Sequence, residues 1–150
     1  MEEIFINIME RIAAEMPELS LIDEDYGQLE SALGDDHYPV TFPCVLIGNT
    51  DANWSDLGGG AQNGAAFITV RLAIDCYTDT HYSSGTYHAV AERWKAANKL
   101  FCTLQGFTPS GCASELTRIK QRDYAMPHNI KVFEFSFSFE LHDESAMQML

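Results

Sequence analysis

The sequence predicts an α+β fold, in which a largely antiparallel sheet of four or five strands is covered on one face by two helices. The prediction rests on a strand at 130–141 with strict apolar alternation, and on two amphipathic helical patterns that can cover its apolar face. The predicted order along the 150 residues is helix, three strands, helix, two strands (α-β-β-β-α-β-β), within a single domain.

The first helix is predicted over 2–16. Glu2 and Glu3 fall in its first turn, where negative charge is favourable beside the positive end of the helix dipole. Pro17 ends the helix, because the residue before a proline disfavours helical backbone angles. Apolar side chains recur at three- and four-residue spacing and form one stripe: Phe5, Ile8, Met9, Ile12 and Met16.

Three strands are predicted next, at 19–24, 42–47 and 67–77. The second is a compact apolar run that is too short for a helix, with Pro43 at its start, where a strand tolerates proline. The third alternates apolar and polar side chains along its length.

Two connections separate these strands. Gly27 predicts a turn, and 31–41 reads as an acidic loop. The segment 48–66 is rich in Gly, Asn and Asp, so we expect a long mobile loop, used as an arm that becomes ordered on a neighbouring subunit.

The second helix is predicted over 86–104, with Thr86 as the N-cap and Gly106 at the C-terminal cap. Its buried stripe consists of Val90, Trp94, Ala97, Phe101 and Leu104.

The last two strands are predicted at 114–124 and 130–141. The second of them places five large apolar side chains on one face, and burying them contributes up to about 10 kcal/mol. These side chains are Phe133, Phe135, Phe137, Phe139 and Leu141.

Charge is divided unequally along the chain. The first 70 residues hold one basic residue, Arg11, against thirteen Asp and Glu, whereas residues 71–150 hold eight Lys and Arg against nine acids. The two parts therefore carry −12 and −1 of the formal charge of −13. Such a chain presents one surface that repels anions and another that attracts acidic protein.

Composition excludes several classes of protein. A pI near 4.5 argues against a nucleic-acid groove or an anionic membrane as main partner, because both need basic surface. The sequence has no apolar run long enough to span a membrane, and its acidic start does not fit a secretory signal. The four cysteines lack Cys-x-x-Cys spacing, so we expect reduced thiols in a cytoplasm: Cys44, Cys76, Cys102 and Cys112.

No residue pattern predicts catalysis, a cofactor or a metal. The glycines at 58–60 and Gly64 lack the Lys-Ser/Thr of a phosphate loop and the order of a dinucleotide-binding turn. No Gly-x-Ser-x-Gly occurs, and no cysteine has a nearby basic motif. His128 follows Pro127 between two strands, where we expect it to serve the hairpin.

One alternative remains open, a small metal-dependent hydrolase that uses His81, His88 and Glu92. His88 and Glu92 share a helix face at four-residue spacing, and Asp79 lies upstream. Such spacing is also common on solvated helices. The N-terminal acids lack the regular spacing of a calcium loop: Asp23, Glu24, Asp25, Asp35 and Asp36.

The strand at 114–124 carries three cations on one predicted face, together with Leu116 and Tyr124. Charge on an edge strand prevents aggregation, which is one interpretation. The other is a subunit interface in which Arg118, Lys120 and Arg122 face acids of a neighbouring copy. A head-to-tail contact of that kind closes into a ring if its rotation allows. The acids expected opposite, or lining a channel, are Asp23, Asp25 and Glu30.

Several short motifs carry a family resemblance. They are Leu21-Ile22-Asp23, Asp25-Tyr26-Gly27-Gln28-Leu29-Glu30, Pro39 to Ile47, Leu104-Gln105-Gly106-Phe107 and Leu116-Thr117-Arg118. Here the chain resembles small proteins found among the tail and neck genes of Bacteroides-type prophages. The element order is similar to that of phage tail-terminator and tail-completion proteins.

The resemblance implies a ring-forming subunit, commonly a hexamer, that caps the tail tube, halts its growth and joins it to the head connector. We therefore expect a non-enzymatic protein of virion assembly, found in the bacterial cytoplasm and then in the tail. Its partners would be itself, tail-tube proteins and head-connector proteins, with DNA only as passing cargo and no membrane. A third possibility is an inhibitor or immunity-type module whose acidic face binds a basic partner.

Overall fold

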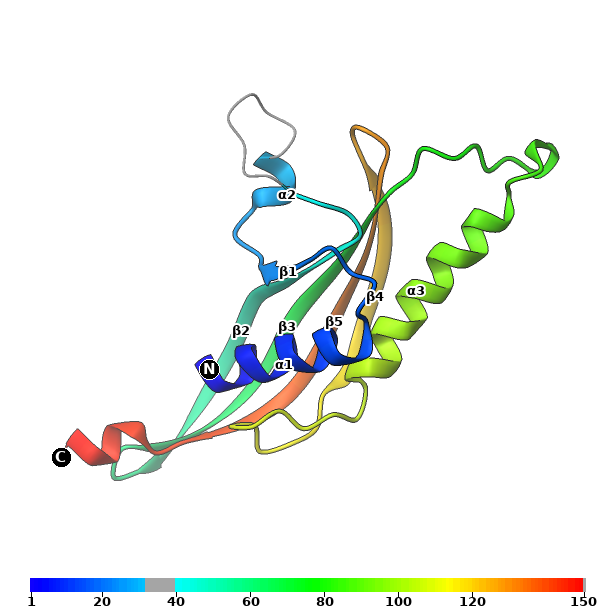
Figure 1. Ribbon diagram of the computed structural model, residues 1–150. Helices are drawn as coiled ribbons and strands as arrows, with labels where there is room; N and C mark the ends of the chain where they lie inside the picture. The colour runs from blue at the N-terminus through cyan, green and yellow to red at the C-terminus, as the bar shows by residue number, and fades with distance from the viewer. Residues whose placement is uncertain (32–39, 150) are drawn as a thin grey trace.

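The computed structural model describes residues 1–31 and 40–149, and in this part of the chain a five-stranded sheet carries two long helices on one face (Figure 1). The strand order is β1-β2-β3-β5-β4, with β1 parallel to β2 and the other neighbours antiparallel. The elements are α1 (Glu2–Glu15), β1 (Leu21–Glu24), α2 (Gln28–Ser31), β2 (Cys44–Gly58), β3 (Ala61–Asp75), η1 (Tyr82–Ser84), α3 (His88–Leu104), β4 (Thr117–Met126), β5 (Ile130–Asp143) and η2 (Ser145–Met149).

The predicted α+β fold and the order of its main elements are confirmed. The structure adds α2, a single turn that follows Gly27, and two short 3-10 helices. We call the side of the sheet that carries α1 and α3 the helix face, and the opposite side the reverse face.

The main core lies between the helix face and the two helices. The alternation predicted for β5 is confirmed, because its four phenylalanines are at most 3% exposed. From α1 and its C-cap, the buried side chains are spaced by four residues: Ile4, Ile8, Ile12 and Met16. Of the predicted stripe, Phe5 and Met9 are only partly buried, and the prediction missed Ile4.

A second, smaller core lies on the reverse face and packs α2 against the sheet. It takes only one or two side chains from each element, so no single strand reveals it by alternation. Its buried members are Leu29, Cys44, Leu46, Ala73, Ile130 and Val132.

The prediction of a long loop at 48–66 is wrong, because this segment is the far part of the β2–β3 hairpin (Figure 1). The turn is formed by Gly59 and Gly60, whose φ angles of 67° and 92° suit a tight two-residue hairpin. Beyond the turn, 62–75 pairs with 130–143 of β5 throughout. The Gly, Asn and Asp content suggested a loop. Strand pairing depends on main-chain N–H and C=O groups, and these residues have them as well.

The second helix begins two residues later than predicted. The N-cap is Tyr87, which makes no capping hydrogen bond through its side chain. Thr86 is not the cap, because its hydroxyl donates to the carbonyl of Asp79 instead. At the other end Gly106 has a φ of 80°, as predicted for a C-terminal cap.

The buried stripe predicted for this helix is correct only in its C-terminal half. Ala97 and Leu104 are buried, whereas Val90 and Trp94 are 40% and 44% exposed. Figure 1 shows the reason: the N-terminal half of α3 diverges from the sheet and has no strand beneath it.

Most of the acidic loop predicted at 31–41 lies outside the described residues, as do Asp35 and Asp36. The four cysteines are free; Cys44 is buried and Cys102 is exposed. None of the described helices is long and apolar enough to cross a membrane.

Candidate functional site

An open hollow of about 790 Å³ lies on the reverse face, between the turn after β1 and strands β4 and β5. Residues from the end of β1 and from α2, β2, β3, β4 and β5 line it. Its charged lining consists of Asp25, Glu30, Arg71, Arg122, Asp123 and Glu134.

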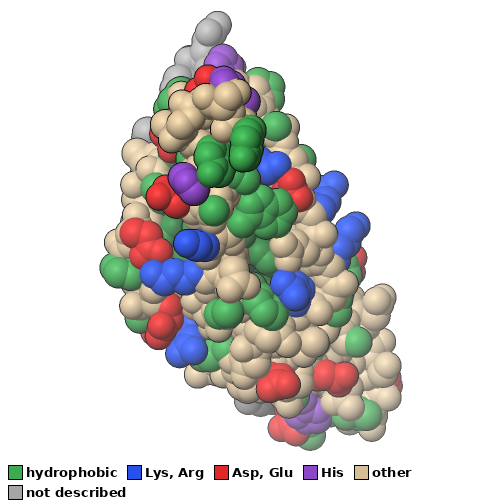
Figure 2. All heavy atoms as spheres, turned by 90° about the vertical axis from the view of Figure 1, so that its right-hand side faces the viewer, with side chains coloured by type: hydrophobic (Ala, Val, Ile, Leu, Met, Phe, Trp, Pro, Cys, Tyr) green, Lys and Arg blue, Asp and Glu red, His purple; other side chains and the backbone are tan. Residues whose placement is uncertain are grey.

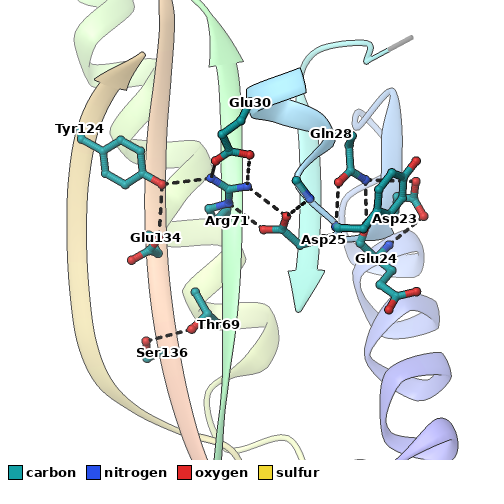
Figure 3. Close-up of polar contacts among 12 residues, drawn as sticks. Asp23, Glu24, Asp25, Gln28, Glu30, Thr69, Arg71, Tyr124, Glu134 and Ser136 are labelled. Atoms are coloured by element: carbon teal, nitrogen blue, oxygen red, sulfur yellow. Dashed lines mark hydrogen bonds and ion pairs between the residues drawn. The ribbon is translucent and has the colours of Figure 1, made fainter. Parts of the chain in front are cut away.

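Arg71 of β3 is the centre of this site and is 6% exposed (Figure 3). Its Nε and Nη2 atoms donate to the two carboxylate oxygens of Asp25, at 2.8 and 3.0 Å. Its Nη1 and Nη2 atoms donate to the two oxygens of Glu30, at 2.7 and 3.3 Å. Nη1 also donates to the hydroxyl of Tyr124 at 3.3 Å, so all three guanidinium nitrogens are engaged.

The end of β1 and the turn after it bring these carboxylates to Arg71. The backbone N–H of Asp25 donates to the carbonyl of Ile47 at 2.8 Å, which extends the pairing of β1 with β2. The neighbouring Gly48 leaves room for this approach, because a Cβ there would lie 2.9 Å from the Cβ of Asp25. Gly27, with a φ of 91°, then turns the chain into α2, which carries Glu30.

Gln28, which is 2% exposed, fixes the same turn from within. Its Nε2 atom donates to the carbonyl of Glu24 at 2.7 Å and to the carboxylate of Asp23 at 3.3 Å. Its Oε1 atom accepts from the N–H of Tyr26 at 2.9 Å. The position of α2 relative to the sheet is therefore set by polar contacts as well as by the small core beneath it.

The charges at the site stabilise one another. Hydrogen bonds from Arg71 lower the pKa of Glu30 below its ordinary value, and they outweigh the opposite effect of burial. For Arg71, burial alone would lower the pKa of the guanidinium, but the hydrogen bonds to Glu30 and Asp25 more than compensate and raise it. Arg71 is thus a permanent cation between two acids.

A further series of hydrogen bonds connects Arg71 to β4, at the edge of the sheet. The hydroxyl of Tyr124 donates to Glu134 Oε1 at 3.2 Å, and Arg122 Nε donates to Glu134 Oε2 at 2.5 Å. Burial raises the pKa of the Tyr124 hydroxyl, which stays protonated and able to donate. The hydrogen bond to Glu134 raises the pKa of Arg122.

Around Arg71 this arrangement is an ion-pair network in which the buried polar groups bond to one another. Among the described residues every buried side-chain nitrogen or oxygen has a hydrogen-bond partner. A nucleophile, a general base or a phosphate-binding arginine would need an atom that is free for substrate, and the donors of Arg71 are all engaged. The network ties β1, α2, β3, β4 and β5 together on the reverse face.

The three cations predicted on one face of the edge strand do not share a face. The ladder between β4 and β5 has a bulge between Arg118 and Lys120, where Ile119 is the extra residue. Arg118 pairs with Phe137 and lies on the helix face, where its guanidinium stacks 3.7 Å from the ring centroid of Phe101.

Lys120 and Arg122 lie on the reverse face, since they pair with Ser136 and Glu134. The prediction of a single face failed because it assumed an unbroken two-residue period. Leu116 and Tyr124, predicted on that same face, also separate: Leu116 joins the main core and Tyr124 packs against the smaller one.

The structure places the three acids of the predicted interface close together, around the end of β1 and α2. Asp25 has a buried carboxylate that is paired within the subunit, at 4% side-chain exposure. Glu30 is paired with the same arginine but is 53% exposed, and Asp23 is half-buried against Gln28. Their side of the sheet is opposite β4, the other edge strand.

The residues of the metal-dependent alternative are not brought together. In the part of the chain that the structure describes, no three His, Cys, Asp or Glu side chains are grouped as a metal site requires. His81 is paired with Asp79 at 3.0 Å, and the ring of His88 lies beside that of Tyr87. His128 has a φ of 68° in the β4–β5 turn, as its predicted role in the hairpin requires.

Sequence reasoning missed the role of Arg71, which falls on the polar face of the alternating strand predicted at 67–77. The available signal was the lone arginine within the run Ile68–Ile74. If that strand is buried on both faces, the arginine needs an acidic partner. Which of the many acids fills that role depends on the turn at Gly27.

Comparison with known proteins gives a likeness of fold. No protein-family model matches the chain, and no curated protein matches it in sequence. Among solved structures, the fold is similar to that of a chain in the virion of a native gene transfer agent (GTA) particle. The two chains are 10% identical, with a TM-score of 0.57, and the match covers 95% of this chain and 96% of that one. The two proteins therefore share a fold over nearly their whole lengths.

Proposed function

We propose that this protein is a non-enzymatic structural subunit of a phage or phage-derived particle. The observation that carries the proposal is the likeness of fold to a chain of a gene transfer agent virion, which extends over 95% of this chain. The site around Arg71 agrees with a structural role, because its polar groups are directed at one another and not at a vacant centre.

Within such a particle, we propose the role of a tail terminator. Copies of the chain would form a ring, in the way hexameric terminators do, that caps the tail tube and joins it to the head connector. The two edges of the sheet differ in charge, with cations on β4 and acids around β1 and α2, which supports a head-to-tail contact between copies.

The proposed seam between copies is electrostatic. Arg118 on the helix face, and Lys120 and Arg122 on the reverse face, would flank the seam with the acids of the neighbouring subunit. Lys120 has no ion pair with any described residue, whereas Arg122 also pairs with Glu134 of its own subunit. Of the acids in the neighbouring subunit, Glu30 is exposed and Asp23 is half-buried, while the buried Asp25 would act indirectly by holding the turn in place.

The test is deletion of the gene in the bacterium that carries it, followed by induction of particles. We expect tails of uncontrolled length that lack heads, and restoration of normal particles by the wild-type gene. We also expect the protein in purified particles by mass spectrometry, and labelled antibody at the head-proximal end of the tail. Particles that lack the protein and are unchanged by its deletion would refute the proposed function.

A further inference from the structure

The N-terminal half of α3 has an apolar face that no described part of the chain covers. Tyr87, Val90 and Trp94 are 38%, 40% and 44% exposed, although they continue the stripe that is buried in the C-terminal half. Trp94 makes one edge contact with Phe133, at 4.9 Å between ring centroids. Contiguous exposed apolar surface of this kind is typical of an interaction site.

Lys and Arg side chains flank this apolar face, with Asp and Glu side chains among them (Figure 2). Figure 2 shows hydrophobic side chains at its centre, with Lys and Arg side chains on both sides of them. Next to Trp94, neither Arg93 nor Lys95 has an ion pair with any residue that the structure describes. Seven of the nine basic residues come from α3, β4 and β5: Arg93, Lys95, Lys99, Arg118, Lys120, Arg122 and Lys131.

The outer face of α1 has the complementary chemistry. Ile6 is 54% exposed at its centre, and a hollow of about 320 Å³ lies beside it. Glu2, Glu3 and Glu10 surround Ile6, and no Lys or Arg of the described residues pairs with them. One helix thus offers an apolar side chain among carboxylates, and the other offers exposed apolar side chains beside cations.

The two surfaces cannot meet within one subunit. Figure 1 shows the N-terminal end of α1 over β2, whereas the N-terminal half of α3 extends beyond β4, at the opposite edge of the sheet. They lie on the same two sides as the β1–α2 acids and the β4 cations. A head-to-tail contact between these two edges of the sheet brings both pairs of surfaces to the same seam.

We propose that α1 of one copy packs against the N-terminal half of α3 of the next copy. Ile6 enters the apolar face between Val90 and Trp94, while Glu3 and Glu10 face Arg93 and Lys95. This inference rests on the ring proposed above and identifies the apolar anchor of its seam. Apolar anchors at the centre of an interface carry most of its affinity, and the charged rim sets partner orientation.

The first test uses two equally exposed aliphatic side chains, Ile6 and Leu57, at 54% and 53%. Ile6→Ser and Val90→Ser should each raise the dissociation constant for self-association about tenfold, as loss of an interface anchor does. Leu57→Ser, at the tip of the β2–β3 hairpin, should leave it unchanged. Sedimentation velocity over a range of concentrations gives the constant, and circular dichroism checks the fold. Equal effects at positions 6 and 57 would overturn the inference.

The second test is a reciprocal charge reversal. The double variants Arg93→Glu with Lys95→Glu and Glu3→Lys with Glu10→Lys should each fail to associate alone, and an equimolar mixture should regain oligomers. A mixture that stays monomeric overturns the inference, as does a wild-type protein that is monomeric at every concentration. Detection of the protein in purified particles tests the proposed function separately. A ring that uses a different seam would still be part of the particle.

Discussion

Arg71 and Asp25 face each other through two parallel hydrogen bonds of 2.8 and 3.0 Å, with side chains that are 8% and 4% exposed. They come from β3 and from the end of β1, which are separated by β2 in the sheet. The pair therefore crosses over β2 at Gly48, the one residue there whose lack of a side chain leaves room.

Removing one member of this pair is expected to be costly. Asp25→Ala should lower the free energy of unfolding by about 3–5 kcal/mol, because it leaves a buried cation short of a partner. Adding Arg71→Met should recover part of that loss, because the uncompensated charge is gone. Urea unfolding measures both.

Glu30→Ala is the matched control, since its carboxylate bonds the same guanidinium but is half exposed. We expect a loss of about 1 kcal/mol or less there. Equal losses of unfolding free energy in Asp25→Ala and Glu30→Ala would contradict the expectation that the more buried carboxylate contributes more.

Acid should weaken the contact between Glu30 and Arg71. The pKa of Glu30 is lowered in the folded protein by hydrogen bonds from Arg71. A lowered folded-state pKa gives stability that is present above the unfolded value, about 4.3, and lost as the pH falls through the folded value. The free-energy difference between wild type and Glu30→Gln should therefore be largest above about pH 5 and shrink below about pH 4.

Urea unfolding of both proteins across this range measures the difference. Glu10→Gln provides the comparison, because Glu10 is exposed and has no ion pair among the described residues; it should change the free energy of unfolding less than Glu30→Gln does. A Glu30 difference that does not change with pH would show that the carboxylate is not stabilised by Arg71.

Long regular patterns in the sequence were sufficient to predict most of the fold. The alternation of β5 and the spacing of apolar residues in α1 each belong to an element that is buried on one face only. For such elements, the spacing of apolar side chains in the sequence shows whether the segment is a strand or a helix. The layer order follows from them, because both apolar surfaces must be buried against each other.

The predictions that failed concern features that side-chain period does not encode. The hairpin around Gly59 is held by main-chain pairing with β5, so its polar composition carried no strand signal. The bulge at Ile119 shifts the period by one residue and moves Arg118 to the helix face. The partners of Arg71 depend on a turn at Gly27, and an acidic chain offers too many candidates for composition to choose among them.

Gly48 should tolerate an added methyl group less well than Gly64. At Gly48, a Cβ would lie 2.9 Å from the Cβ of Asp25 and 3.0 Å from its backbone oxygen, neither of which can move without displacing the end of β1. We expect Gly48→Ala to lower the free energy of unfolding by about 1–3 kcal/mol.

At Gly64 the obstacle is the ring of Trp54, at 2.8 Å, and that side chain is 41% exposed and can rotate. Gly64→Ala should therefore cost less. Urea midpoints rank the two variants, and the reverse ranking would contradict the close packing of Asp25 over β2.

Lys120 should contribute to association and not to folding. It is exposed on the reverse face of the edge strand and has no ion pair with any described residue, whereas Arg122 is paired with Glu134 at 2.5 Å. Lys120→Glu should weaken self-association, more at low salt than at high salt, with an unchanged melting temperature. Arg122→Glu should lower the melting temperature as well, because it places two carboxylates side by side.

The double reversal of Arg118 and Arg122 to Glu should also weaken oligomers while the subunit stays folded. Light scattering and thermal unfolding measured on the same samples separate the two effects. Unchanged oligomers in the double variant would remove β4 from the proposed seam.

The cysteines should differ sharply in reactivity. Burial raises the pKa of the Cys44 thiol to about 12, so almost none of it is present as the reactive thiolate, and the side chain has no exposed surface. Cys102 lies exposed on α3.

A maleimide at mildly alkaline pH should therefore label Cys102 in the folded protein and reach Cys44 only after unfolding in urea. Peptide mass spectrometry follows both reactions. The variant Cys102→Ser should lose the fast labelling phase. Labelling of Cys44 at the rate of Cys102 in folded protein would mean that the reverse-face core opens readily, and the Arg71 network above it would then not hold α2 in place.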